Sequence, residues 1–281
     1  MMRVIGHKHC RIGEGPIWND AEQCLYFTNG MEKEICKLDL VTGRLTEIPT
    51  ERGVSAIAFD RSNRTIVSRA DGVSYLDPGA AEPLYDPAKY QILHANDMKV
   101  GPDGRIYVGT QSEKRLKLSE RVDGKLYSID RSGTVRTLLD GLLLSNGMDW
   151  SMDETRFYHT DSATHVIREY AFEKASGEIE ATGRSVEIHG VDGFTIDEND
   201  FLYVARWGHA QIAVVDTRTM REVDRIEVPA QKPASCAFAG ADMTELVAVT
   251  AAYNVDLAKD PLAGCTFHKS MPIHGRKPYL F

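Results

Sequence analysis

The most constraining feature of this chain is a pattern that recurs six times, at intervals of 41 to 50 residues. Each unit opens on a small or polar residue and reaches a large apolar residue four positions later. The openings are Glu14, Ser55, Asn96, Asn146, Asp192 and Ala234. A fixed period in this range is typical of propellers and solenoids. The repeat therefore limits the fold before any single motif is considered.

Each unit contains signals for four β-strands. The opening segment is followed by a turn rich in Asp, Asn, Gly or Ser and by a second apolar segment, a combination typical of a β-hairpin. In most units a third strand follows, for example at residues 34–40 and 72–77, and a shorter fourth strand comes after a Gly or Thr turn. The pattern predicts an all-β fold, a six-bladed β-propeller with four antiparallel strands in each blade.

Other architectures fit the pattern less well. A β-sandwich needs no such period, and a doubly wound α/β fold needs amphipathic stretches of about 10 to 15 residues between strands, which the sequence lacks. We therefore expect very little helix. Since no Pro/Ser-rich linker or block of charge interrupts the repeat, a single propeller domain is expected over residues 1–281.

Composition and charge limit which binding partners and which cellular compartment are expected for this protein. The formal net charge is −8 and the pI is about 5.6. Because a nucleic-acid backbone is bound by clustered Lys and Arg, no nucleic-acid partner is expected. No stretch approaches the roughly 20 apolar residues that span a bilayer, and the start of the chain lacks the apolar run of a signal peptide. The five cysteines are odd in number and form no CxxC pair, which favours reduced thiols in the cytoplasm.

In a propeller, one register of the successive innermost strands forms a ring around the mouth of the central channel. The six unit openings are such a register. Four of them, Glu14, Asn96, Asn146 and Asp192, carry oxygen atoms suited to Ca²⁺, Mg²⁺ or Mn²⁺. A single Asn or Asp at such a position is more often a turn cap, but four converging groups need a cation, waters or a ligand to satisfy them. His94, two residues before Asn96, is an equally good candidate for ligand contact and for a structural role.

Taken in order, several segments resemble the SMP-30/gluconolactonase/luciferin-regenerating-enzyme family of six-bladed propellers. The resemblance runs over nearly the entire chain. Its main carriers are "GEGPIW" at the start, "NDMKVGPDGRIYVGT" in the third unit, "SNGMDWSMDETRFYHTDS" in the fourth and "DGFTIDENDFLYVARWG" in the fifth. The resemblance implies a divalent-metal-dependent lactonase that opens sugar lactones.

The resemblance also assigns roles to individual residues. The family's metal ligands fall on Glu14, Asn146 and Asp192, which are members of the ring. The family's substrate-contacting Asn corresponds to Asn96, and His94 stands where members often have Arg. A neutral His offers one donor and one acceptor where Arg offers a permanent cation. The resemblance therefore does not identify gluconolactone as the specific substrate of this chain.

The expected mechanism uses one divalent metal ion, Ca, Zn, Mn, Mg or Fe, which polarises the lactone carbonyl and binds the attacking water. Asp192 is the expected base and Asp97 the reserve candidate, because a carboxylate beside metal and water lies within reach of the proton. Asn96, His94 and Glu113, the last from the family's loop after "GT", are the expected substrate contacts. Two other hypotheses stay open: a non-catalytic propeller that binds a metal or small molecule, and a hydrolase of other esters at the same metal.

Overall fold

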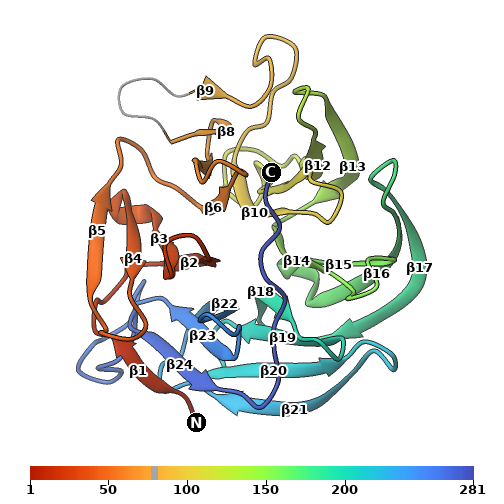
Figure 1. Cartoon of the computed structure of the whole chain (residues 1–281). Helices are drawn as coiled ribbons and strands as arrows, with labels where there is room; N and C mark the ends of the chain where they lie inside the picture. Colours follow the sequence, from red (N-terminus) through yellow and green to blue (C-terminus); the bar gives the residue numbers. More distant parts are fainter. Residues whose placement is uncertain (77–81) are drawn as a thin grey trace.

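A computed structural model describes residues 1–76 and 82–281, and over these residues it shows six four-stranded antiparallel sheets arranged in a ring (Figure 1). In five of these sheets the hydrogen-bonded order follows the chain, from an innermost to an outermost strand. The predicted six-bladed β-propeller is therefore confirmed.

The first three blades are each built from four consecutive strands. These strands are β2 (Gly13–Asn19), β3 (Cys24–Asn29), β4 (Glu34–Leu38) and β5 (Leu45–Pro49) in blade one; β6 (Ala56–Phe59), β7 (Thr65–Arg69), β8 (Gly72–Tyr75) and β9 (Glu82–Pro83) in blade two; and β10 (Ala95–Val100), β11 (Ile106–Thr110), β12 (Gly124–Ile129) and β13 (Val135–Leu142) in blade three. The third strand expected at 72–77 is β8, and residue 77 lies outside the described residues.

The remaining blades complete the ring. Their strands are β14 (Ser145–Trp150), β15 (Arg156–Asp161), β16 (Val166–Glu173) and β17 (Glu178–Glu187) in blade four; β18 (Val191–Ile196), β19 (Phe201–Arg206), β20 (Gln211–Asp216) and β21 (Arg221–Glu227) in blade five; and β22 (Pro233–Ala239), β23 (Glu245–Thr250), β24 (Thr266–Ser270) and β1 (Arg3–Gly6) in blade six. The N-terminal β1 pairs with β24, where Arg3 lies opposite His268. Both ends of the chain thus contribute to one sheet, which closes the ring.

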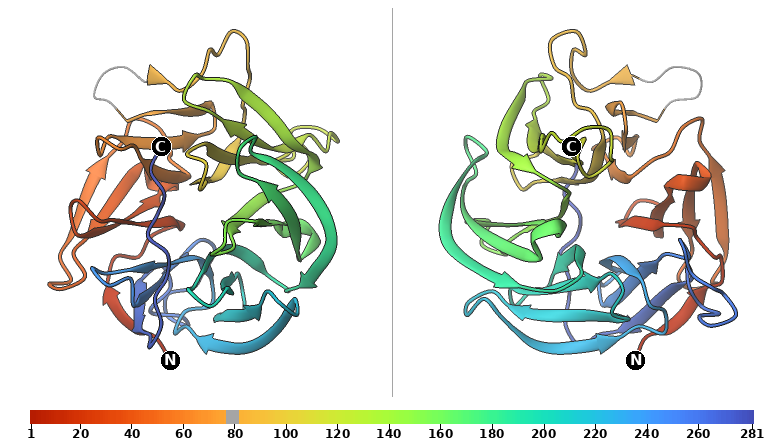
Figure 2. Two further views of the ribbon diagram at one scale, coloured as in Figure 1. Left: turned by 45° about the vertical axis from the view of Figure 1, so that its right-hand side comes forward. Right: turned by 180° about the vertical axis from the view of Figure 1, so that it is seen from behind.

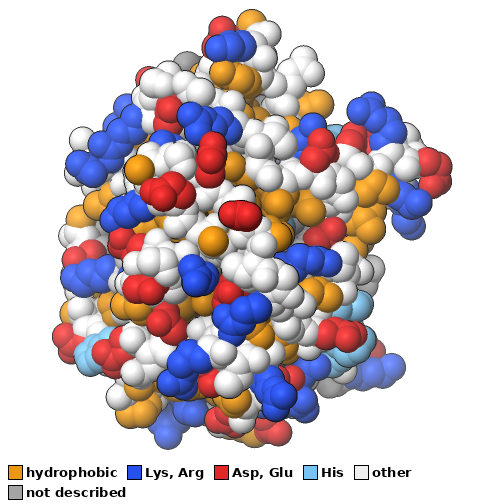
Figure 3. Space-filling model, turned by 90° about the vertical axis from the view of Figure 1, so that its right-hand side faces the viewer, with side chains coloured by type: hydrophobic (Ala, Val, Ile, Leu, Met, Phe, Trp, Pro, Cys, Tyr) orange, Lys and Arg blue, Asp and Glu red, His pale blue; other side chains and the backbone are white. Residues whose placement is uncertain are grey.

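Within the described ranges, helical structure is limited to two 3₁₀ turns, η1 (Gly30–Glu32) and η2 (Ser162–Thr164). The expectation of very little helix is confirmed. Over the same ranges, no helix has the length and apolar character needed to cross a membrane. On the face drawn in Figure 3, acidic and basic side chains are interspersed.

The turns between the first and second strands explain the polar part of the repeat. A residue with positive φ occupies this turn in every blade, and these residues are Gln23, Asn63, Gly104, Glu154, Asp200 and Met243. In blade two the Asp60 side chain accepts the backbone N–H groups of Ser62 and Arg64, both at 2.8 Å. Asp197 does the same in blade five. Such turns set the register of each hairpin.

The innermost strand is irregular near the ring position in five blades of the described chain. The pairing register shifts between Glu14 and Ile17 in β2, for example, and between Val191 and Phe194 in β18. In β2 the irregular stretch includes Gly15, whose φ is 55°. A β-bulge bends the strand and re-aims a side chain. The repeat predicts the register of the ring but not these bulges.

The C-terminal segment covers the end of the channel opposite to the ring residues (Figures 1 and 2). It ends on blade two, where the Phe281 N–H donates to the Phe59 carbonyl oxygen at 3.0 Å. On the way, Arg276 donates to the carbonyl oxygen of Trp150 at 2.8 Å and forms an ion pair with Asp149. The ring residues therefore lie at the other, open end.

Candidate functional site

Four members of the predicted ring surround one space at the open end of the channel. Glu14, Asn96, Asn146 and Asp192 line a cavity of about 320 Å³, called here the mouth cavity. Glu14 and Asn96 also line an adjoining cavity of about 360 Å³ over blades one and two. Small-molecule sites have volumes of about 300–1,000 Å³. The structure thus brings side chains from β2, β10, β14 and β18 into a space large enough for a sugar-sized ligand.

The other two ring positions contribute little chemistry. The Ser55 hydroxyl lies 2.8 Å from the Ser68 hydroxyl and 3.1 Å from the carbonyl oxygen of Ala95, so its hydrogen bonds are made within the fold. Ala234 is buried. The functional part of the ring is therefore the set of two carboxylates and two carboxamides.

The two carboxamides hold each other. The Asn96 Nδ2 donates to Asn146 Oδ1 at 2.9 Å and to the Ser145 carbonyl oxygen at 3.0 Å. Gln111 Nε2 donates to Asn96 Oδ1 at 3.2 Å, and Asn146 Nδ2 donates to Ser162 Oγ at 3.0 Å. These bonds fix the Asn146 amide, whose oxygen keeps a second lone pair for a ligand.

A buried aspartate holds the turns on which this network depends. The Asp161 carboxylate accepts the backbone N–H groups of Leu143 at 2.8 Å, Leu144 at 3.0 Å and Ala163 at 3.2 Å. The first two bonds fix the turn that leads into β14, and the third fixes η2, which carries Ser162. The segment "HTDS" at residues 159–162 therefore positions the Asn146 side chain, through the turn before β14 and through Ser162.

Of the two carboxylate residues of the mouth cavity, Asp192 is buried and Glu14 is partly buried. Burial, followed by the negative charge of Asp97, raises the pKa of Glu14 to about 8. Burial also raises the pKa of Asp192 well above its usual range, and the charges of Glu14 and Asp97 add to the rise. A backbone hydrogen bond from Gly193 and the charge of Arg115 oppose it. Three acidic groups thus repel one another in a small region, and a bound cation would relieve that repulsion.

The donor set fits a hard divalent cation. Glu14 and Asp192 bring carboxylate oxygens and Asn146 brings an amide oxygen to the same cavity, and oxygen ligands are those that Ca²⁺ and Mg²⁺ prefer. In the described chain neither carboxylate forms a salt bridge. No group of three His, Cys, Asp or Glu side chains among the described residues could hold a metal ion. The fit therefore depends on the Asn146 amide and on further ligands from water or substrate.

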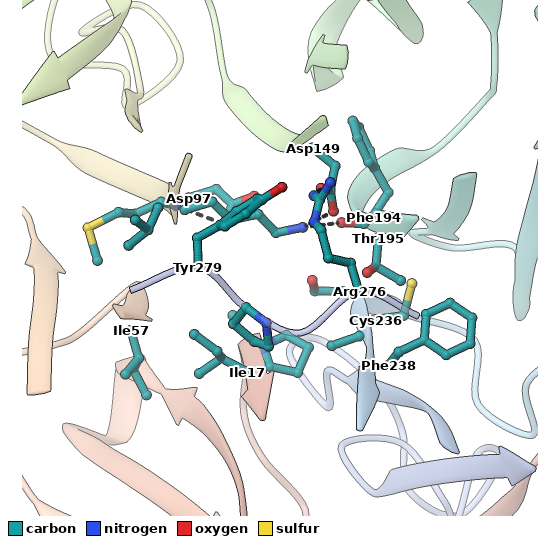
Figure 4. Close-up of a pocket in the computed structure, with 18 of the residues that line it drawn as sticks. Ile17, Ile57, Asp97, Asp149, Phe194, Thr195, Cys236, Phe238, Arg276 and Tyr279 are labelled. Carbon is teal, nitrogen blue, oxygen red and sulfur yellow. Dashed lines mark hydrogen bonds and ion pairs between the residues drawn. The ribbon is translucent and has the colours of Figure 1, made fainter. Parts of the chain in front are cut away.

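Asp97 lies below the mouth. It follows Asn96 in β10, where successive side chains alternate between opposite sides, and it lines the interior of the channel (Figure 4). The cavity there measures about 70 Å³. Asp149 beside it pairs with Lys99 at 2.6 Å and with Arg276. Because this space holds only a few waters and these charges are paired, the substrate-sized cavity is the mouth.

His94 and Glu113 line a separate cavity on the flank of blade three. Gln111 is common to this cavity and the mouth cavity. The Glu113 carboxylate accepts the Ser119 hydroxyl at 2.6 Å, and His94 has a positive φ of 57°. The structure does not bring these two side chains to the mouth cavity, and their contact with substrate stays a prediction.

Six residues of the mouth cavity come from loops between the second and third strands of a blade and so lie outside the repeating register that marked the ring. They are Gln111, Arg115, Ser162, His165, Trp207 and Tyr253. Such loops vary in length and have no fixed hydrophobic pattern, so the repeat carries no signal for them. Their common place after the second strand is the signal that could have found them.

Comparisons with known proteins identify a family and its relatives. A family model described as "SMP-30/Gluconolactonase/LRE-like region" matches residues 12–252. Regucalcin from Bos taurus is 28% identical over 287 residues, which are 98% of this chain and 96% of the relative. The putative sugar lactone lactonase YvrE from Bacillus subtilis (strain 168) is 29% identical over 280 residues, which are 96% of this chain and 94% of the relative.

The fold is also found among solved structures. The crystal structure of a calcium-binding protein, regucalcin, from Agrobacterium tumefaciens matches with a TM-score of 0.88. Its sequence identity is 24%, and the match covers 100% of this chain and 97% of the other. At this identity the likeness shows a shared propeller fold.

Proposed function

Because the chain belongs to the SMP-30/gluconolactonase/LRE-like family, we propose that it is a metal-dependent hydrolase of sugar lactones. The observation that carries this proposal is the meeting of Glu14, Asn146 and Asp192 around one cavity. A relative named as a putative sugar lactone lactonase supports the substrate class, and a structural neighbour described as calcium-binding is consistent with a cation.

Lactone hydrolysis adds water to the carbonyl carbon and breaks the ring C–O bond, which gives the hydroxy acid. A divalent cation held by Glu14, Asn146 and Asp192 would supply a Lewis acid and lower the pKa of a water molecule. Asp192 takes the proton of the attacking water at a carboxylate oxygen, since it reaches both the ligand set and the cavity. Asp97, in the interior of the channel, is the reserve base. From there its charge also raises the pKa of Asp192 in the mouth cavity.

The remaining side chains orient the substrate. Asn96 fixes Asn146 through its amide hydrogen bond, while Trp207 and Tyr253 present apolar rings to the cavity for the carbon skeleton of a sugar. His94 and Glu113 contact any part of the substrate that extends over blade three toward the cavity they share with Gln111. Holding the lactone in one pose reduces the entropic cost of water attack.

The test is a panel of aldonolactones followed by acid release, with the spontaneous rate subtracted, on protein whose metal content is measured. Chelation should abolish the enzymatic rate, and Ca²⁺, Mn²⁺, Zn²⁺, Mg²⁺ or Fe²⁺ should restore it. Glu14→Gln should weaken metal binding far more than it weakens folding, whereas the exposed Glu51→Gln is the matched control. Full activity in excess chelator would reject the role of the metal. Metal binding without any lactone or ester hydrolysis would favour a non-catalytic propeller.

A further inference from the structure

The loop between β11 and β12, residues 111–123, forms one wall of the mouth cavity and is firmly built. Ser112 is fully buried, and its N–H donates to the Leu143 carbonyl oxygen at 3.0 Å. Its own hydroxyl accepts the Arg115 N–H at 3.1 Å, and its carbonyl oxygen accepts the Leu116 N–H at 3.1 Å. The backbone at Arg115 is therefore anchored to the core of the propeller.

The basic residues of this loop differ in their partners. Lys114 pairs with Glu120 at 3.3 Å, and Arg121 lies 3.4 Å from Asp123. Arg115 forms no salt bridge with any described residue, although it lines the mouth cavity. Its guanidinium is thus a cation at the ligand space that acts on Asp192 through its charge but is not paired with a carboxylate at salt-bridge distance.

The neighbouring wall of the mouth cavity also offers a hydrogen-bond donor. The Gly190 N–H donates to His165 Nδ1 at 3.5 Å, a contact that favours the tautomer with a proton on Nε2. The acidic side chains lining this cavity are Glu14 and Asp192, which are the candidate ligands of the cation. Besides the candidate ligands of the cation, the mouth cavity therefore presents hydrogen-bond donors from Arg115 and His165 to a ligand with acceptor oxygens.

We propose that the substrate is an anionic sugar lactone, with a carboxylate or phosphate remote from the ester, and that Arg115 binds this anion, with His165 as a second donor. The inference rests on the proposed function and specifies its substrate class. A guanidinium matches the planar or tetrahedral oxygens of such groups with two parallel hydrogen bonds. With a net charge of −8, the protein as a whole repels anions, so a local cation is needed to hold one.

The experiment compares kcat/KM for three lactones on the metal-loaded protein: glucono-1,5-lactone, which is neutral, a glucarolactone, which carries a carboxylate, and 6-phosphogluconolactone. The wild-type protein should favour one of the two anionic lactones over the neutral one. Arg115→Gln should lower the ratio of anionic to neutral kcat/KM by about 10- to 100-fold, mostly through KM, because a charge-assisted hydrogen-bond pair is lost. Arg115→Lys should recover part of the ratio, since it restores the charge but not the planar fork.

Lys117→Gln is the matched control, because Lys117 is an exposed cation of the same loop and does not line the mouth cavity. It should leave the ratio unchanged within about twofold. A wild-type preference for the neutral lactone, or an equal loss on all three lactones in Arg115→Gln, would overturn the inference and leave the proposed function standing. Hydrolysis of none of the three lactones would overturn the inference and count against the proposed function.

Discussion

Acid should weaken this fold through one buried histidine in blade four. His159 of β15 is 2% exposed, and its Nε2 lies 2.7 Å from the Ser145 hydroxyl at the start of β14. Burial lowers the pKa of this imidazole from 6.5 to about 4, and the nearby charge of Asp161 only partly offsets the effect. The ring is therefore neutral in the fold under conditions in which the unfolded chain holds a proton on it.

The sign and size of the effect follow from these pKa values. Between pH 6.5 and pH 4 the unfolded state binds more protons at His159 than the folded state, so the free energy of unfolding falls as the pH falls. The shift corresponds to about 3 kcal/mol lost between pH 7 and pH 4, since one pKa unit is worth about 1.4 kcal/mol. Above pH 7 the residue should contribute no pH dependence, because the imidazole is then neutral in both states.

The assay is urea unfolding at pH 7, 6, 5 and 4, followed by tryptophan fluorescence, for the wild-type protein and His159→Gln. Many carboxyl groups also titrate near pH 4, so the informative quantity is the difference between the two curves. The variant can be less stable at pH 7, but its stability should fall by about 3 kcal/mol less on acidification. The exposed His7→Gln is the control and should parallel the wild type. Parallel curves for His159→Gln and wild type would refute the reasoning.

Three other substitutions test separate parts of the structure. Asp192→Asn should lower kcat by about 10²- to 10⁴-fold in a lactone assay at saturating metal, and a parent-like rate would remove Asp192 as the base. Asp149→Asn leaves Lys99 and Arg276 without their shared carboxylate, so urea unfolding should show a loss of about 3–5 kcal/mol. An unchanged midpoint would mean that the Arg276–Asp149 ion pair does not hold the C-terminal segment. In Gly147→Ala the new methyl group would meet the Phe194 ring and lie 2.5 Å from the Asp192 carbonyl oxygen. This overpacking should lower the free energy of unfolding by about 1–3 kcal/mol and weaken metal affinity in a titration. Unchanged affinity would show that the Asp192 backbone can move without loss of metal binding.

The sequence by itself determined the architecture and the composition of the ring. The period of 41 to 50 residues and the polar turns specify repeated hairpins, and repetition around an axis turns one sequence register into one spatial ring. This is why Glu14, Asn96, Asn146 and Asp192 could be grouped from positions far apart in the chain. Local signals were sufficient because each blade is formed mainly by neighbouring segments.

Only the tertiary structure decided how the ring is built into a site. Strand alternation and the bulge in β10 put Asn96 at the mouth and Asp97 inside the channel, although they are adjacent in sequence. The loops after the second strands brought Arg115 to the mouth cavity and left Glu113 on the flank of blade three. The pairing of β1 with β24 closed the sixth blade. These features depend on hydrogen bonds and packing between segments that are distant in the chain, and a local pattern of residue types does not encode them.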